Sequence, residues 1–192
     1  MNKEYLKGLF MNHRVFHVFV TLCLILVCAA MVPSLGCAAR SAMMVPASFE
    51  VVNKHAKTVQ ITESVGGRET HPLWTSQISN SAFTEALANA VAKSQVFQSV
   101  VKGGKADCIL DVTILKYDQP LLGADFDIKM KTRWELTDSV THKLIWSDTI
   151  DTTYKARLTD ALVSSERLQK ANEGAVRTNI AEGIKRLSRL RL

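Results

Sequence analysis

The sequence predicts an α+β domain in which a four-stranded, mostly antiparallel sheet carries two helices on one face. Residues 126–136 alternate between apolar and polar side chains without interruption, which is typical of an antiparallel strand with one buried face. Residues 79–91 and 164–190 repeat their apolar side chains every three or four positions, which is typical of helices packed on such a face. We therefore expect the order β-α-β-β-β-α.

The first half of this domain is predicted to hold one strand and one helix. The strand covers residues 58–65 and ends at a Gly-Gly turn. A loop over 68–77 leads to the helix, whose first turn can be capped by the hydroxyl of Ser79 or Ser81. The apolar stripe of this helix consists of Phe83, Ala86, Leu87, Ala90 and Val91.

The second half is predicted to hold three strands and a helix. The strands span residues 108–117, 126–136 and 144–150. The final helix spans 164–190 and contains Gly174 and Gly183, each of which destabilises a helix by about 1 kcal/mol, so we expect both to allow close packing on the sheet. Because a helix links the first and second strands, those strands should be parallel neighbours joined by a right-handed crossover.

The N-terminal 36 residues have the pattern of an export signal. Lys3, Lys7 and Arg14 precede an apolar run of 18 residues over 15–32. This run is longer than the ~7 to 15 residues of an ordinary signal core and reaches the ~18 that can span a bilayer. A retained single span in the inner membrane is therefore an alternative, and translation from Met11 would also give a conventional signal peptide.

A proline ends the apolar run, and Ser34-Leu35-Gly36-Cys37 follows it. This tetrapeptide resembles the lipobox of bacterial lipoproteins, with Ser34 and Leu35 in exchanged order. The resemblance implies signal cleavage between Gly36 and Cys37, a diacylglyceryl group on the Cys37 thiol and an acyl group on its new amine. Ala38 stands where an inner-membrane retention signal has aspartate, which implies transfer to the outer membrane.

These features predict three segments: a lipoprotein-type signal peptide over 1–36, a lipidated tether over 37–48 and a single periplasmic α+β domain over 49–192. One acyl chain holds a protein on a membrane marginally, whereas two or more hold it stably. We therefore expect a chain anchored through Cys37 on the periplasmic face of the outer membrane.

Cysteine usage favours an exported chain without disulfides. Cys23 and Cys28 leave with the signal peptide, and Cys37 is lipidated, so Cys108 stands alone. Its apolar neighbours in the sequence favour a buried structural thiol over a nucleophile.

Charge gives little support for a nucleic-acid partner. The full chain has a net charge of +6, and removal of residues 1–36 leaves +4 because 21 basic and 17 acidic residues remain. Lys185, Arg186, Arg189 and Arg191 account for that excess, so the rest of the domain is neutral. These four cations either contact an anionic lipid surface or complement the dipole at a helix C-terminus.

No catalytic or metal-binding motif is present. His55, His71 and His142 are scattered, with no cysteine or carboxylate at ligand spacing, so we expect no metal. Asp125 and Asp127 imitate the D-x-D of sugar-nucleotide sites, but they fall on the polar side of an alternating strand and are interpreted as solvated. We therefore expect neither an enzyme nor a bound cofactor.

One predicted hairpin loop carries two adjacent leucines. Leu121 and Leu122 stand where a hairpin normally exposes polar residues, within the segment 118–124. They either contact a partner or a bilayer, or fold back under the edge of the sheet.

The order of elements over residues 58–190, the Phe83-x-x-Ala86-Leu87 helix, the alternating strand and the Trp146 strand resemble small envelope lipoproteins of diderm bacteria. Auxiliary lipoproteins of ABC-type envelope transporters and the lipopolysaccharide-assembly lipoprotein are similar in pattern. The resemblance implies a periplasmic, non-enzymatic component that docks onto a transport or assembly machine. A lipid- or glycan-binding module is the alternative, and it requires an apolar cavity.

Overall fold

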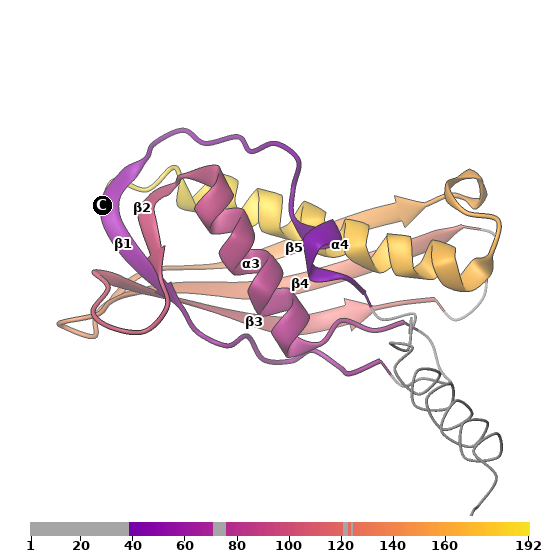
Figure 1. Cartoon of the computed structure of the whole chain (residues 1–192), viewed down its shortest axis with the longest axis horizontal. Coiled ribbons are helices and arrows are strands. Elements are labelled where there is room, and N and C mark those ends of the chain that lie inside the picture. The colour runs from indigo at the N-terminus through magenta and orange to yellow at the C-terminus, as the bar shows by residue number, and fades with distance from the viewer. Residues whose placement is uncertain (1–38, 71–75, 121–122, 124) are drawn as a thin grey trace, which may run out of the picture. The chain divides into compact units, whose positions relative to one another are not determined.

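A five-stranded sheet with the order β2-β1-β3-β4-β5 forms the centre of the computed structural model, which describes residues 39–70, 76–120, 123 and 125–192. In chain order the elements are α2 (Ser41–Met44), β1 (His55–Ile61), α3 (Asn80–Ser94), β2 (Phe97–Val101), β3 (Cys108–Asp118), β4 (Phe126–Asp138), β5 (Leu144–Ala156), the 3-10 turn η1 (Leu158–Asp160) and α4 (Ser164–Leu187). The two long helices, α3 and α4, cover the same face of the sheet (Figure 1). The α+β class is confirmed.

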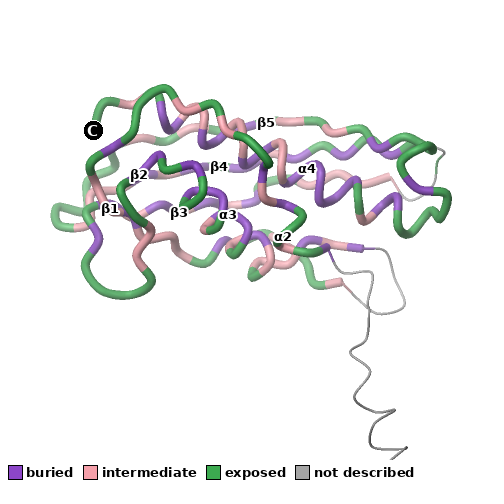
Figure 2. The backbone as a smooth tube through the Cα atoms, turned by 45° about the horizontal axis from the view of Figure 1, so that its top comes forward, coloured by how far each residue is buried: buried purple, intermediate pink, exposed green. Residues whose placement is uncertain are grey.

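Strand β4 shows why the sheet has one covered face. Its alternate residues Phe126, Ile128, Met130, Thr132, Trp134 and Leu136 are all buried. Between them Asp127, Lys129 and Arg133 are exposed, on the face that no helix covers. Figure 2 colours the backbone by the burial of each residue, and buried and more exposed residues alternate along the strands. The predicted period of two is confirmed, and it determines which side of the sheet the helices bury.

The predicted four-stranded sheet is wrong, because β2 adds a fifth strand that the sequence pattern does not reveal. Five residues are too few to show a convincing alternation, and only two residues separate the end of α3 from the start of β2. Gln95 allows this abrupt change of direction by taking a left-handed conformation with φ 54°. Strand β2 pairs in parallel with β1, whose other edge pairs in parallel with β3. The predicted parallel pairing of β1 and β3 is confirmed.

Strand β1 and helix α2 also differ from the prediction, and β5 continues to Ala156 instead of ending at residue 150. Strand β1 covers His55–Ile61 instead of 58–65, and Val65 forms an isolated bridge with Thr113 while its side chain is exposed. The short helix α2 was not predicted, because four residues carry no helical period. Its Met44 side chain is fully buried in the core, so tertiary packing holds this turn in place. The described residues therefore contain three α-helices, where the sequence predicted two.

The segment predicted as a tether lies along α4 from its first described residues onward. The backbone N–H of Arg40 donates to Glu173 Oε1 at 3.1 Å, and Arg177 donates to the carbonyl of Met43 at 2.7 Å. Farther on, Asn53 N–H donates to the Ser188 carbonyl at 3.0 Å. Contacts therefore advance along the chain and along α4 in the same direction.

Helix α4 is joined to the sheet by close packing at two glycines. A Cβ added at Gly183 would fall on the ring of Trp134, and one added at Gly174 would fall on the ring of Tyr154. Both aromatic side chains belong to the covered face, at β4 and β5. The predicted role of Gly174 and Gly183 in close packing is confirmed.

A buried polar network crosses the same interface. Trp134 Nε1 donates to Thr132 Oγ1 at 2.9 Å, and that hydroxyl donates to Asn179 Oδ1 at 2.7 Å. The amide of Asn179 in turn donates to Thr152 Oγ1 at 3.1 Å. Because each of these bonds is directional, the network sets the register of α4 over β4 and β5.

Gly183→Ala should destabilise the protein, although alanine is normally the better helix former. The added methyl group overlaps the buried Trp134 ring, and overpacking of this kind costs about 1–3 kcal/mol. Urea unfolding of the two proteins measures the difference in free energy.

Thr178→Ala, on the partly exposed side of the same helix, is the matched control and should change stability by less than about 0.5 kcal/mol. A Gly183→Ala protein as stable as the parent would show that the helix and the tryptophan are not in contact.

Candidate functional site

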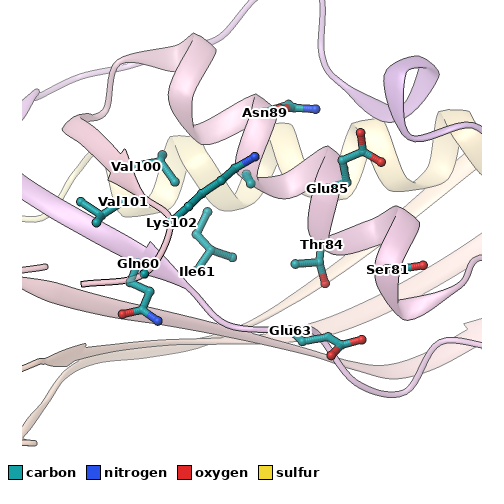
Figure 3. Close-up of a pocket in the computed structure, with 12 residues that line it drawn as sticks. Gln60, Ile61, Glu63, Ser81, Thr84, Glu85, Asn89, Val100, Val101 and Lys102 are labelled. Carbon is teal, nitrogen blue, oxygen red and sulfur yellow. The ribbon is translucent and has the colours of Figure 1, made fainter. Parts of the chain in front are cut away.

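An open groove of about 460 Å³ lies between α3 and the C-terminal ends of β1 and β2 (Figure 3). The two strands are parallel and in register, with Gln60 opposite Val101, so both end at this groove. Helix α3 connects them and forms the other wall. The helix contributes Ser81, Thr84, Glu85, Ala88 and Asn89 to the lining. The strands and the chain beyond them contribute Gln60, Ile61, Glu63, Val100, Val101, Lys102 and Gly103.

The groove combines an apolar floor with a polar rim. Ile61, Val100 and Val101 are partly buried, whereas Glu85 and Lys102 are exposed. Side chains of both charge signs therefore border a mainly apolar depression, as Figure 3 shows from the labelled residues. This composition is suited to an amphipathic ligand or segment that buries an apolar side and leaves polar groups at the rim.

The hydroxyl groups of the groove already have structural partners. Thr84 Oγ1 donates to the carbonyl of Asn80 at 2.8 Å and accepts from the N–H of Ser64 at 2.9 Å. Ser81 Oγ lies 3.1 Å from Ser79 Oγ at the start of α3. Neither hydroxyl is adjacent to a histidine of the described chain, so the arrangement does not provide an activated nucleophile.

Sequence reasoning missed this groove because it missed β2. The pairing of β2 with β1 brings Val100, Val101 and Lys102 to the groove. No pattern in the neighbouring sequence predicts that pairing. The nearest hint was the short Phe97–Val101 run between a helix and the pair Gly103-Gly104. Such a run is compatible with a short edge strand.

The C-terminal cations lie partly in a second open hollow, of about 570 Å³, on the outer side of α4. Lys185 Nζ contacts Glu50 Oε2 at 2.7 Å, and this contact lowers the pKa of Glu50. Arg186 contacts Glu182 at 2.8 Å and Asp148 at 3.0 Å, and both carboxylates raise the pKa of Arg186. Two of the four predicted surface cations are thus paired within the domain.

The other two cations differ from the first pair. Arg189 and Arg191 are exposed beyond the end of α4, and no carboxylate of the described residues forms a salt bridge with them. Of the four predicted surface cations, Arg189 and Arg191 are thus the two that face solvent without such a salt bridge. The anionic-surface contact stays a prediction.

Asp125 and Asp127 do not form a ligand site together. Asp125 contacts Lys155 Nζ at 3.1 Å and accepts from the N–H of Leu158 at 3.2 Å, and these contacts hold the pKa of Asp125 below its usual value. Asp127 is exposed on the uncovered face, in register with Lys155. Both carboxylates are surface groups of a hairpin mouth.

The two described histidines have different surroundings. His55 is buried, its ring is tilted against Phe97 with centroids 5.4 Å apart, and its Nε2 donates to the Leu187 carbonyl at 3.2 Å. His142 is exposed in the β4–β5 turn at φ 55°. His71 lies outside the described residues. Over the described ranges, no three His, Cys, Asp or Glu side chains gather closely enough to hold a metal ion.

Three predictions fall outside the described residues, namely those for Gly36 and Cys37 and for the pair Leu121 and Leu122. Lipidation, signal cleavage and the contact predicted for the two leucines therefore stay predictions. Across the ranges that the structure does cover, no helix has both the length and the hydrophobicity needed to cross a bilayer.

Comparisons with known proteins give similarity in fold. No protein-family model matches the chain, and no curated protein matches it in sequence. A Xanthomonas campestris protein of the DUF330 family is similar in structure with a TM-score of 0.56 at 11% identity, over 75% of this chain and 93% of that one. A hypothetical protein from Chlamydia trachomatis has a TM-score of 0.51 at 11% identity, over 69% of this chain and 96% of that one.

Lipoproteins occur among the more distant matches. A minor lipoprotein from Acinetobacter baumannii has a TM-score of 0.44 at 11% identity, over 73% of this chain and 94% of that one. At such identities the two better matches show a shared fold of bacterial proteins, and a score below 0.5 adds no argument about function.

Cys108 should resist thiol reagents in the folded protein. Its side chain is fully buried in β3, and burial raises the pKa of the thiol, so little thiolate is present and access is closed. We expect its alkylation at pH 8 to be roughly 100-fold slower than that of an exposed cysteine. Mass spectrometry of the peptide that contains Cys108 measures the rate.

Val140→Cys provides the exposed reference thiol within the same chain. Urea should abolish the difference between the two positions. Equal rates without urea would contradict the burial of Cys108.

Proposed function

We propose that this protein is a lipid-anchored periplasmic lipoprotein of the bacterial envelope that serves a transport or assembly machine as a non-catalytic accessory or scaffold. The observation that carries the proposal is the apolar run over 15–32 followed by Ser34-Leu35-Gly36-Cys37. An export signal that ends in a small residue and a cysteine supports acylation of that cysteine. Acyl chains then hold the domain at the membrane without a spanning helix.

The described domain supports an accessory role through its surface. The groove between α3, β1 and β2 has an apolar floor and a charged rim, which suits a segment of a partner protein. Elsewhere on the described part, Ser79 caps α3, Lys131 pairs with Asp151, and Thr132 and Asn179 belong to the buried network. The arrangement favours binding over chemistry, and it calls for no cofactor or metal.

A second candidate function uses the same groove for a small molecule. Its volume of about 460 Å³ is within the usual range for ligand pockets, and its lining is mainly apolar. A lipid chain or a glycan with an apolar face fits this chemistry. The groove is open to solvent, so the partner-protein role is preferred.

Cys37→Ser should abolish lipidation and trap the protein with its leader attached. The intact mass of the parent, extracted from membranes, should correspond to residues 37–192 plus a diacylglyceryl and an N-acyl group. Serine cannot form the thioether that precedes cleavage, so the variant should keep its full length and its unmodified mass. Cys108→Ser is the matched control, because it removes a thiol of the domain and should leave processing unchanged. A parent protein with residues 1–36 retained, or with a free thiol at position 37, would refute the anchored form.

Ala88→Glu should weaken co-purification with envelope proteins without lowering thermal stability. Ala88 lines the groove from a partly exposed position of α3, so a longer charged side chain occupies the groove while the helix is preserved. Affinity purification from detergent-solubilised envelopes, with quantitative mass spectrometry, measures the loss.

Ala92→Glu is the control, one turn farther along α3 and exposed outside the groove. If Ala88→Glu instead releases a lipid or glycan that the parent carries in native mass spectrometry, the small-molecule function replaces the accessory role. Unchanged partners and no bound molecule would exclude the groove from both functions.

A further inference from the structure

Three large apolar side chains project into solvent close together in the loop between β5 and α4. Leu162 is 91% exposed, and its neighbour Val163 is 59% exposed. Leu158, on η1 of the same loop, is 49% exposed. These three residues form what we term the apolar tip. Exposed clusters of this kind usually meet another apolar surface.

Side chains of α4 hold the loop that carries the apolar tip. Arg167 is buried, and its Nη1 donates to the Ala161 carbonyl at 2.7 Å, directly before Leu162. Its guanidinium carbon lies 5.1 Å from the ring centroid of Phe126, at the start of β4. Lys170 Nζ donates to the Asp160 carbonyl at 2.8 Å. The loop is therefore held from below at two points while its apolar side chains face outward.

Charges that would oppose burial of the apolar tip are paired beside it. Asp125 pairs with Lys155 at 3.1 Å, and Glu166 pairs with Lys170 at 3.3 Å. The carboxylate of Asp160 accepts from the N–H of Arg157 at 2.7 Å. The surroundings of the tip are thus close to neutral, which lowers the repulsion that an anionic membrane surface would exert on them.

The path of the N-terminal segment places the anchor near this end of the domain. Arg40 bonds the buried carboxylate of Glu173 through its N–H at 3.1 Å and its Nε at 3.3 Å. Later residues of the segment contact later residues of α4, so among these contacts Arg40 meets the helix nearest to its start. Figure 1 shows the described chain beginning beside α2 and α4, in the half of the domain that holds the start of α4.

Chain length limits how far the anchor can be. Three residues separate Cys37 from Arg40 and span about 11 Å at most. From Glu173 back to Ser164, the first residue of α4, the helix measures about 14 Å. A membrane that holds Cys37 therefore lies within about 11 Å of Arg40, whose partner Glu173 is nearer the start of α4, beside the apolar tip, than its end.

We propose that Leu158, Leu162 and Val163 insert into the lipid surface to which Cys37 is attached, so that the domain has a fixed orientation on the membrane. The inference rests on the proposed acylation of Cys37 and adds a second, non-covalent contact to it. Acyl chains and a shallow apolar loop together hold a domain more firmly than the chains alone. Strands β4 and β5 then lead away from the bilayer.

The opposite end of the sheet offers a matched control. Val140 is 83% exposed in the β4–β5 turn, and β4, with 13 residues, separates this turn from the apolar tip by about 40 Å. Leu144 and Ile145 are also exposed at that end. Hydrophobicity by itself therefore does not distinguish the two ends, whereas the anchor does.

The test uses the full chain, processed in a bacterial host and reconstituted in vesicles of phosphatidylethanolamine and phosphatidylglycerol. Leu162→Cys and Val140→Cys are each labelled with the same environment-sensitive fluorophore, and buried Cys108 stays unlabelled. Iodide in the buffer and a doxyl group on the lipid chains serve as quenchers. Iodide quenching at position 162 should be roughly threefold or more weaker than at position 140, and doxyl quenching should be correspondingly stronger.

Each outcome separates this inference from the proposed function. Equal iodide quenching at both positions in a protein whose mass shows acylation would overturn insertion and leave the anchor intact. A protein without acyl groups would overturn the anchor and the inference together. Protection of position 162 in native envelopes but not in pure lipid vesicles would assign the apolar tip to a protein partner and would also overturn insertion. Leu162→Ser with Val163→Ser, both exposed positions, should remove doxyl quenching of a label at Leu158→Cys without lowering the melting temperature, because Val163 is the N-cap residue of α4 and serine is a favourable cap.

Discussion

The one-sided sheet is the constraint on which the rest of the structure depends. Trp134 lies on its covered face, with its ring under Gly183 and its indole N–H bonded to Thr132. Asn179 extends this contact from α4 to β5 through Thr152. Burial drives the helices onto the sheet, and the polar network selects a single position for α4 among those that burial would allow. A change at this interface should therefore shift every surface that α4 supports.

Both surfaces with a proposed role derive from this arrangement. Helix α3 leaves a groove where it passes over the parallel ends of β1 and β2, because the strands stop beneath the helix. The N-terminal segment packs along helix α4, where Arg40 bonds to the buried Glu173. The groove and the anchored end belong to different helices. With Cys37 acylated as proposed, the domain can bind with one surface while the other faces the membrane.

Long periodic elements were predictable, and short ones were not. The eleven-residue alternation in β4 and the helical stripes of α3 and α4 each contain enough repeats to identify the element and its buried side. Strand β2 and helix α2 contain one or two repeats and depend on partners that are distant in the sequence. Missing β2 also meant missing the groove, since four of its twelve lining residues, Val100 to Gly103, lie at the end of β2 or directly after it.

By itself, the sequence determined the α+β class, the covered face of β4 and the packing role of Gly183, and its N-terminal pattern predicts an export signal and an anchor at Cys37. These features are local, because each depends on the period or the spacing of neighbouring residues. Tertiary structure decided the fifth strand, the groove, the pairing of Lys185 and Arg186 with carboxylates, and the bond from Arg167 that holds the loop before Leu162. Those features join residues far apart in the chain, and their energies arise only when the sheet and helices have assembled.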